Sequence, residues 1–315
     1  MRVVDFSTET VSQAVCASIW KSLLPYTHRM AVTPAAASAR TGNDAPIQVP
    51  PPQQTFRTKS FKYADRLFNG VVGVMSAVHE GFWLGCLNAD ELNSITAAHF
   101  GESRFYTSNE HNLSGFFDWE AEVFGRYFRP GSRLLVAAAG AGREVLALRK
   151  AGFEADGFEC SLPLVTASQR IFDEFGEPDP VKYWPPDSVP PGPVNHDGLI
   201  LGWSAYTHVP TKNRRIALLA GLRKRVPSDA PLILSFFTRQ NDSVCEEHVY
   251  RVGTFCGFFL RRTKETLELG DRIEWRRFVH RFTKDELEGE LGTAGFRVDY
   301  YREGTGEGHA VAISV

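Results

Sequence analysis

Apolar and polar residues near the middle of the chain follow first the pattern of a buried strand and then that of an amphipathic helix. Residues 133–138 form a short apolar run, as a buried parallel strand requires, and Gly140 and Gly142 follow it. Apolar residues then recur at helical spacing until Gly152, and residues 155–158 form a second apolar run. The pattern predicts a strand, a tight turn, a helix and a second strand.

The same alternation continues to the C-terminus and predicts an α/β fold. A hairpin is expected around Gly270-Asp271, between residues 265–269 and 272–278. Further strands are expected at residues 197–202, 232–237, 296–301 and 309–314, and further helices at residues 162–175, 211–225, 243–259 and 282–294.

The first 127 residues follow a different pattern. Residues 11–24 have helical periodicity, and residues 32–54 are rich in Ala, Ser, Thr and Pro, which indicates a linker or a mobile tail. Between residues 61 and 98 apolar residues again recur at helical spacing, with Asn88 as the predicted helix cap. We expect an N-terminal helix and linker in residues 1–60, a helical cap on the substrate side in residues 61–127, and the main domain in residues 128–315.

Composition narrows the class of protein. The chain has 315 residues, of which 43% are hydrophobic, and its net charge of −2 gives no general attraction to nucleic acid or to an anionic membrane. Five scattered cysteines lack metal-ligand spacing, so neither a disulfide framework nor a metal site is predicted. No apolar run reaches the roughly 18 residues of a membrane span, and a cytoplasmic protein without membrane contact is expected.

An acidic residue ends the second predicted strand. Glu159 lies about 20 residues after Gly140, where a carboxylate can accept hydrogen bonds from both hydroxyls of a ribose. Gly140 and Gly142 allow a ligand to approach the backbone closely. A nucleoside cofactor is therefore predicted.

The residues after the turn distinguish between nucleoside cofactors. A dinucleotide-binding turn has a third glycine where this chain has Val145, and it holds a pyrophosphate at the helix N-terminus. The helix begins instead with Arg143 and Glu144, a pair suited to the carboxylate and the ammonium group of an amino acid. In these residues and in Glu159 the chain resembles the class I S-adenosylmethionine-dependent methyltransferases, whose motifs are a glycine-rich turn after one strand and an acidic residue at the end of the next.

This resemblance covers about residues 131–315 and implies a doubly wound, seven-stranded Rossmann-like sheet with the last strand antiparallel, preceded by an N-terminal helical cap. It implies S-adenosyl-L-methionine as the cofactor. The family commonly has an acid and a glycine where this chain has Val136 and Ala138, so Glu144 is expected to bind the methionine amino group. Asp187 is expected to contact the adenine, although turn formation after two prolines explains it nearly as well. The residues expected around the cofactor are Ala138, Gly140, Gly142, Arg143, Glu144, Glu159, Cys160, Asp187, Ser188, Trp203 and Tyr106.

Chemistry on the methyl acceptor is expected in the loop after the strand at residues 197–202. Trp203 and Tyr206 offer aromatic rings there, and His208 is the first candidate for a general base because an ordinary histidine pKa is about 6.5. Tyr206 and His111 are the further catalytic candidates. A helix-start or packing role for His208 stays open.

The acceptor is expected to be a small molecule, because the chain lacks an Asn-Pro-Pro-Tyr signature, a Pro-Cys nucleophile and a basic tail. Oxygen, nitrogen and sulfur nucleophiles all remain open, as does a homodimer through the N-terminal helical region. Two other classes also remain open: an NAD(P)-type Rossmann oxidoreductase, and a non-catalytic S-adenosylmethionine-binding protein.

Overall fold

The computed structural model describes residues 55–239, 244–260, 267–304 and 306–315. The chain divides into two compact units, Met1–Gly73 and Val74–Val315, and the boundary falls within helix α2 (Phe56–Cys86). The second unit contains the sheet and the candidate site. The predicted helix at residues 11–24 and the predicted linker at residues 32–54 lie outside the described residues.

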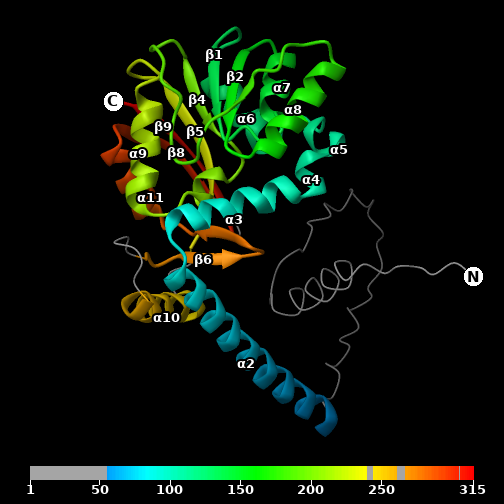
Figure 1. Cartoon of the computed structure of the whole chain (residues 1–315), viewed down its shortest axis with the longest axis vertical. Helices are drawn as coiled ribbons and strands as arrows, with labels where there is room; N and C mark the ends of the chain where they lie inside the picture. The colour runs from blue at the N-terminus through cyan, green and yellow to red at the C-terminus, as the bar shows by residue number, and fades with distance from the viewer. Residues whose placement is uncertain (1–54, 240–243, 261–266, 305) are drawn as a thin grey trace, which may run out of the picture. The chain divides into compact units, whose positions relative to one another are not determined.

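A seven-stranded sheet, in the order β3-β2-β1-β4-β5-β9-β8, forms the core of the second unit (Figure 1). Neighbours from β3 to β5 are parallel, whereas β9 is antiparallel to both β5 and β8. The prediction of a seven-stranded sheet with its last strand antiparallel is thus confirmed. The strands are β1 (Arg133–Ala137), β2 (Glu154–Glu159), β3 (Val181–Tyr183), β4 (Gly198–Leu201), β5 (Pro231–Phe237), β8 (Phe296–Glu303) and β9 (Glu307–Ser314).

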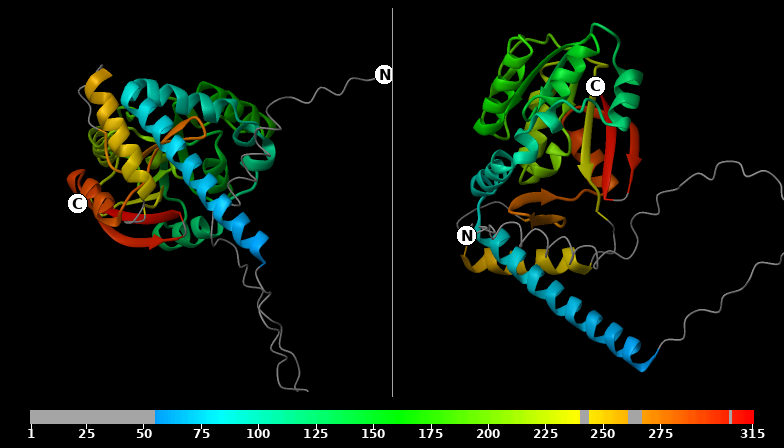
Figure 2. Two further views of the ribbon diagram at one scale, coloured as in Figure 1. Left: turned by 90° about the horizontal axis from the view of Figure 1, so that it is seen from below. Right: turned by 90° about the vertical axis from the view of Figure 1, so that its right-hand side faces the viewer.

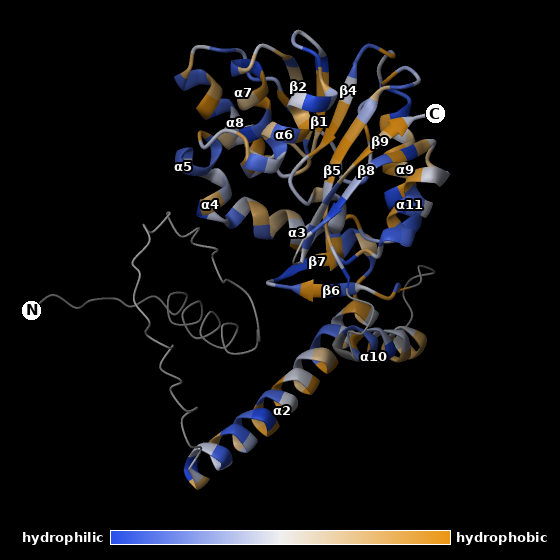
Figure 3. Ribbon diagram, turned by 180° about the vertical axis from the view of Figure 1, so that it is seen from behind, coloured by the Kyte–Doolittle hydropathy of each residue, from blue (hydrophilic) through white to orange (hydrophobic). Residues whose placement is uncertain are grey.

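Helices cover both faces of this sheet. In β1, Leu135 and Ala137 pack on the face covered by the later helices, and Leu134 and Val136 pack on the face covered by the earlier ones. Strands buried on both faces need apolar residues at successive positions, and Figure 3 shows β4 and β5 as mainly hydrophobic ribbons. The covering helices are α6 (Asp118–Tyr127), α7 (Arg143–Lys150), α8 (Leu162–Glu174), α9 (Lys212–Arg223) and α11 (Lys284–Thr293).

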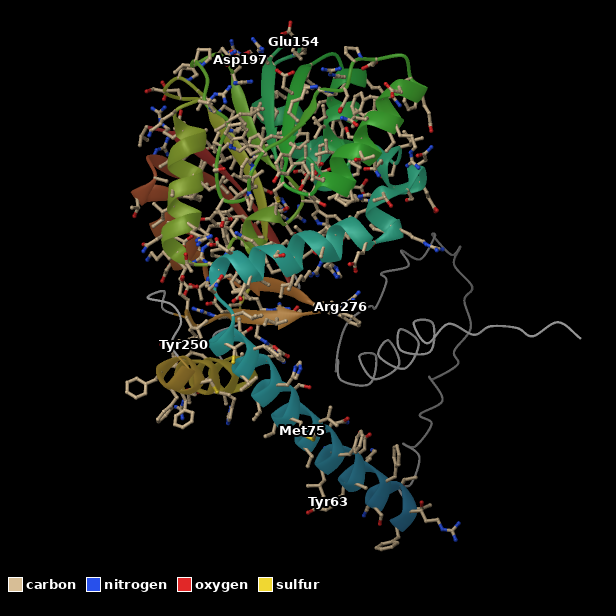
Figure 4. The ribbon with its side chains drawn as sticks, viewed as in Figure 1. Tyr63, Met75, Glu154, Asp197, Tyr250 and Arg276 are labelled. Atoms are coloured by element: carbon tan, nitrogen blue, oxygen red, sulfur yellow. The ribbon has the colours of Figure 1, made fainter. Side chains whose placement is uncertain are left out.

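A helical cap lies along the carboxyl ends of the parallel strands. Helix α3 (Ala89–Glu102) runs beneath this edge and packs against strand β7 (Arg277–His280) of a hairpin (Figures 1 and 2). Glu154 and Asp197 mark the opposite edge of the sheet (Figure 4). As predicted, Asn88 caps α3: its side chain accepts from the backbone N–H of Glu91, and the Glu91 carboxylate accepts from that of Asn88. The short helices α4 (Arg104–Thr107) and α5 (Asn109–Asn112) continue the cap, and α10 (Val244–Leu260) lies beyond the hairpin.

The predicted position of the hairpin turn was wrong. Strands β6 (Asp271–Glu274) and β7 (Arg277–His280) turn at Trp275 and Arg276, both with positive φ, and not at Gly270-Asp271. Asp271 instead begins a strand, where its buried carboxylate lies 2.7 Å from Nδ1 of His280 and accepts from the N–H of Glu268. The turn lacks the Asn-Gly or Asp-Gly pair that identifies such hairpins in a sequence.

Gly202 allows the end of β4 to lie against the end of β1. Its N–H donates to the carbonyl oxygen of Ala137, and a Cβ at this position would overlap the carbonyl oxygen of Ala138, a backbone atom that cannot rotate away. We expect Gly202→Ala to lower the free energy of unfolding by about 1–3 kcal/mol, as overpacking does. Gly125→Ala is the control: Gly125 is exposed in α6 and no atom lies near a Cβ added there, so this substitution should leave the free energy of unfolding unchanged or raise it. Urea denaturation measures both, and a Gly202→Ala protein as stable as wild type would contradict the prediction.

Candidate functional site

A cavity opens at the carboxyl ends of β1, β2, β3 and β4, the edge at which open α/β sheets bind their ligands. It encloses about 1150 Å³ free of protein atoms, counted out to its mouth. Residues of α3, α4 and α5 close one side, and the first turn of α7 and the loops after the strands form the rest. Ten of the eleven predicted cofactor residues line it: Ala138, Gly140, Arg143, Glu144, Glu159, Cys160, Asp187, Ser188, Trp203 and Tyr106.

The eleventh residue, Gly142, has a structural role. Gly140 and Gly142 both have positive φ, 58° and 92°, and a Cβ on Gly140 would meet open space in the cavity. A Cβ on Gly142 would instead lie 2.7 Å from the ring of Phe172 in α8. Gly140 is therefore the position that admits a ligand close to the backbone, while Gly142 lets α7 begin against α8.

Glu159 ties the tip of β2 to the glycine turn. One carboxylate oxygen accepts from the N–H of Gly140 at 2.9 Å, and the other accepts from the N–H groups of Cys160 and Ser161 at 2.8 Å each. Burial raises the pKa of Glu159, and these three donors oppose the rise. Burial and the nearby Glu159 also raise the pKa of the Cys160 thiol, which stays protonated. The site thus presents a fixed acceptor at the strand tip.

Arg143 is held by four hydrogen bonds and is not free to bind a ligand carboxylate. Its guanidinium donates to both oxygens of Glu120, at 2.6 and 2.8 Å, to Glu144 at 2.8 Å and to the carbonyl oxygen of Gly115. All three charged side chains are buried. The expectation that Arg143 and Glu144 divide the two ends of a zwitterion between them is therefore corrected, because Arg143 is neutralised within the protein.

Glu144 carries the negative charge of this group toward the cavity. The same oxygen that accepts from Arg143 also accepts from the backbone N–H of Trp203 at 3.1 Å, so it joins α7 to the loop after β4. Burial raises the pKa of Glu120, and its two bonds to Arg143 oppose the rise. With Glu120 ionised the three side chains carry one net negative charge, and with it protonated they are neutral. In neither state does the group carry a net positive charge that would attract an anion.

Asp187 lies where the loop after β3 meets the cap. It has a positive φ of 55°, and its Oδ2 accepts from Nδ2 of Asn93 in α3 and from Arg214 in α9 at 3.1 Å. Burial raises its pKa, and both donors oppose the rise. Ser188 follows and donates to the carbonyl oxygen of Pro185 at 2.8 Å. A contact between Asp187 and an adenine stays a prediction.

Five aromatic rings form a continuous wall of the cavity, which we call the ring wall: Phe100, Tyr106, His111, Trp203 and His208. The ring centroid of Phe100 lies 5.1 Å from that of His208 and 4.9 Å from that of Tyr106. Tyr106 is 5.6 Å from His111, which is 6.3 Å from Trp203. The wall runs from the loop beside Glu144 to the hairpin side of the cavity.

His208 lines the cavity but is not a base of ordinary strength. Its Nδ1 lies 2.7 Å from the carbonyl oxygen of Phe278, so Nδ1 carries the proton and Nε2 is an acceptor. Burial first, and then the charge of Arg277, lower the pKa of His208 to about 3. The expected titration near 6.5 is therefore corrected. Burial and Arg143 also lower the pKa of His111.

Tyr206 does not belong to the site. Its side chain is fully buried and does not line the cavity, and its hydroxyl donates to Glu290 of α11 at 2.5 Å. Arg215 of α9 donates to the same carboxylate, and the Tyr206 ring stacks on Phe282. Burial and Glu290 raise the pKa of the phenol well above its ordinary value. The catalytic role predicted for Tyr206 was wrong, because the 3-10 turn Ala205–His208 directs it into the core.

The face of α3 that lines the cavity was not predicted from the sequence. Asn93, Thr96, Ala97 and Phe100 lie at the i, i+3, i+4 and i+7 positions of one helical face, and all four line the cavity. Two of them, Asn93 and Thr96, are buried polar residues. A polar pair within an otherwise inward-facing stripe is a signal that could have identified this face.

Neither a membrane-spanning helix nor a cluster suited to a metal ion is found among the described residues. No helix among them has the length and hydropathy needed to cross a bilayer. The same residues contain no group of three or more His, Cys, Asp or Glu side chains that could hold a metal ion.

Solved structures resemble this fold, while neither the protein-family models nor the curated proteins give a match to the sequence. The 1,6-didemethyltoxoflavin-N1-methyltransferase of Burkholderia thailandensis, with bound 1,6-didemethyltoxoflavin and S-adenosylhomocysteine, is 16% identical over 73% of this chain and 91% of its own, with a TM-score of 0.52. PH0226 of Pyrococcus horikoshii is 12% identical over 67% and 93%, with a TM-score of 0.50. The chain thus has the Rossmann-like fold found in class I S-adenosylmethionine-dependent methyltransferases, as the sequence predicted.

The low pKa of His208 makes stability depend on pH. An unfolded histidine binds a proton below about pH 6.5 and the native His208 only near 3, so the native state loses stability as the pH falls below about 6.5. Between pH 7.5 and 5.5, we expect wild type to lose about 1 kcal/mol more than His208→Asn, slightly below the full 1.4 kcal/mol because cavity water screens the ring. Urea denaturation at both pH values tests this. His79→Asn changes an exposed histidine and is the control, which should keep the pH dependence of the wild-type stability. An equal loss of stability in wild type and in His208→Asn would contradict the prediction.

Proposed function

We propose that this protein is an S-adenosylmethionine-dependent methyltransferase that acts on a small molecule. The observation that carries the proposal is the charge at the start of α7, where Glu120 and Glu144 outweigh or balance Arg143 beside an open glycine turn. A sulfonium and an ammonium group are both cations and suit this end of the cavity. The fold shared with known methyltransferases supports the same assignment.

The NAD(P) alternative is disfavoured by the same charges. A dinucleotide places its pyrophosphate at the N-terminus of the first helix, where unpaired N–H groups attract anions. Here two buried carboxylates lie next to that terminus, and the position of the third glycine is occupied by Val145, which is fully buried. Among the described residues that line the cavity, no uncommitted cation is present to balance a diphosphate.

Residues of the cavity suit the ribose and the ammonium group of the proposed cofactor. Glu159 would accept from the ribose hydroxyls, Glu144 would face the ammonium group, and Gly140 would admit the ligand to the backbone. Asp187 and Ser188 would lie beside the adenine. When bound, S-adenosylmethionine supplies an electrophilic methyl group, and the protein's share of the chemistry is to position the acceptor and exclude water.

His111 and His208 are the residues that would handle a proton of the acceptor. Both line the cavity as neutral imidazoles, because burial and nearby arginines lower their pKa values. His111 is half-buried and can exchange a proton with solvent, which makes it the stronger candidate for general base. His208 would hold an acceptor N–H or O–H through Nε2.

We also propose that the chain forms a homodimer through its N-terminal helical region and works in the cytoplasm. In the second unit, α2 exposes Val74, Met75 and Val78, which are 59%, 66% and 49% accessible. Apolar residues at such spacing suit a helix–helix contact. Sedimentation of wild type and of Met75→Glu tests the dimer, which the charge should weaken.

The proposed cofactor is tested by mass spectrometry of the purified protein and by calorimetric titration. We expect S-adenosylhomocysteine to bind and NADH not to bind at comparable concentration. Tighter binding of NADH would overturn the proposal in favour of the oxidoreductase. Binding of S-adenosylmethionine without methyl transfer to any compound of a metabolite panel would favour the non-catalytic alternative.

Loss of the Glu159 carboxylate should weaken cofactor binding. We expect Glu159→Ala to reduce the binding free energy of S-adenosylhomocysteine by about 1.5–3 kcal/mol, the range for a hydrogen bond to a charged group. Glu154→Ala removes an exposed carboxylate from the other end of the same strand and should bind as wild type does (Figure 4). Thermal unfolding of each variant shows whether the turn survives, and a folded Glu159→Ala with unchanged affinity would refute the ribose contact.

A further inference from the structure

We propose that the methyl acceptor is a flat aromatic ring compound that carries no carboxylate or phosphate. This inference rests on the proposed function and names the chemical class of its substrate. It is carried by two properties of the cavity: the ring wall, and the lack of an available cation among the described residues that line it.

The ring wall offers flat apolar surface where an acceptor would lie. Four of its five rings come from the cap helices and the loop after β4, and the wall begins where Trp203 meets Glu144: Phe100, Tyr106, His111 and Trp203. His208 extends the wall beneath Phe100. Aromatic ligands pack on such rings in offset or edge-to-face geometry and gain about 0.5–1.5 kcal/mol per ring pair beyond the burial of area. A saturated ligand of the same size gains only the free energy of burying its apolar surface.

The charges of the cavity exclude acidic acceptors. Among the described residues that line it, Arg143 is the sole arginine or lysine, and its guanidinium is already bonded to Glu120, Glu144 and Gly115. Arg277 lies over the far side of the wall, 5.6 Å from the Phe100 centroid, and does not line the cavity. A carboxylate or phosphate would therefore enter a site that offers carboxylates and neutral imidazoles but no counter-charge.

Three bicyclic probes separate the two halves of the proposal. 2-Naphthol is flat and uncharged, decahydro-2-naphthol has the same skeleton without aromatic rings, and 3-hydroxy-2-naphthoate adds a carboxylate. Each is titrated by calorimetry into wild-type protein saturated with S-adenosylhomocysteine. We expect 2-naphthol to bind about tenfold more tightly than either of the other two. Equal or tighter binding of the saturated or of the acidic probe, or no binding of 2-naphthol at millimolar concentration, would overturn the proposal.

Two leucine variants locate the contact on the ring wall. Phe100→Leu keeps an apolar side chain and removes a ring, so it should weaken 2-naphthol severalfold and leave decahydro-2-naphthol nearly unchanged. Phe105→Leu is the matched control, because Phe105 is 54% exposed, touches the rings of Tyr106 and His111, and does not line the cavity. If both variants weaken 2-naphthol equally, the ring wall is not the binding surface.

A third variant tests whether the carboxylates around Arg143 exclude acidic ligands. Glu120→Gln keeps the shape of the side chain and removes one of the two carboxylates that neutralise Arg143. The affinity for 3-hydroxy-2-naphthoate should rise severalfold relative to that for 2-naphthol. An unchanged ratio in a folded variant would count against the charge argument, and Glu122→Gln, an exposed substitution on the same helix, is its control.

Failure of this inference and failure of the proposed function give different results. If S-adenosylhomocysteine binds but the probes show no preference for an uncharged aromatic ring, the methyltransferase proposal stands and the acceptor class is wrong. If S-adenosylhomocysteine does not bind, the cofactor proposal falls. The probes are then titrated into the free protein, where their order of affinity still decides whether the cavity selects uncharged aromatic compounds.

Discussion

The ion cluster around Arg143 holds the candidate site together. Arg143 begins α7, Glu120 belongs to α6, and Gly115 lies in the loop before it, while Glu144 reaches the N–H of Trp203 after β4. One guanidinium thus fixes the glycine turn, the helix that precedes the sheet and the loop of the central strand. Removing one partner of a buried ion pair costs about 3–5 kcal/mol, since it leaves a charge without compensation. The same three charged side chains that fix the site also set its net charge.

The cap is held against the sheet by hydrogen bonds from elements distant in sequence. Thr96 of α3 accepts from the N–H of Phe278 in β7 at 2.9 Å, and the carbonyl oxygen of Phe278 lies 2.7 Å from His208. Asn93 of the same helix bonds to Asp187. The hairpin is therefore part of the site, although it supplies no cavity-lining residue in the described chain: it positions α3 on one side and His208 on the other.

Features set by local pattern could be predicted from the sequence, and features set by tertiary packing could not. Buried strands, the glycine turn and the Asn88 cap leave short-range signals, and these predictions were confirmed. Tyr206 and His208 are two residues apart in one loop, yet the first enters the core and the second lines the cavity. That difference depends on the 3-10 turn and on the partner of Tyr206, Glu290, which is 84 residues away. No pattern within the loop encodes it.

The distribution of charge along the cavity agrees with methyl transfer from a cationic donor to a neutral acceptor. Carboxylates lie at the glycine turn and at the tip of β2, and the ring wall consists of aromatic side chains and neutral imidazoles. The faces of aromatic rings attract cations, so the wall would also favour a sulfonium placed between the two sides. Burial first, and then the charge of Arg277, lower the pKa of His208 and keep it neutral, and Arg277 does so from outside the cavity. With Arg277 behind the wall and Arg143 neutralised at the turn, the described lining residues offer no uncommitted positive charge, and the donor would supply it.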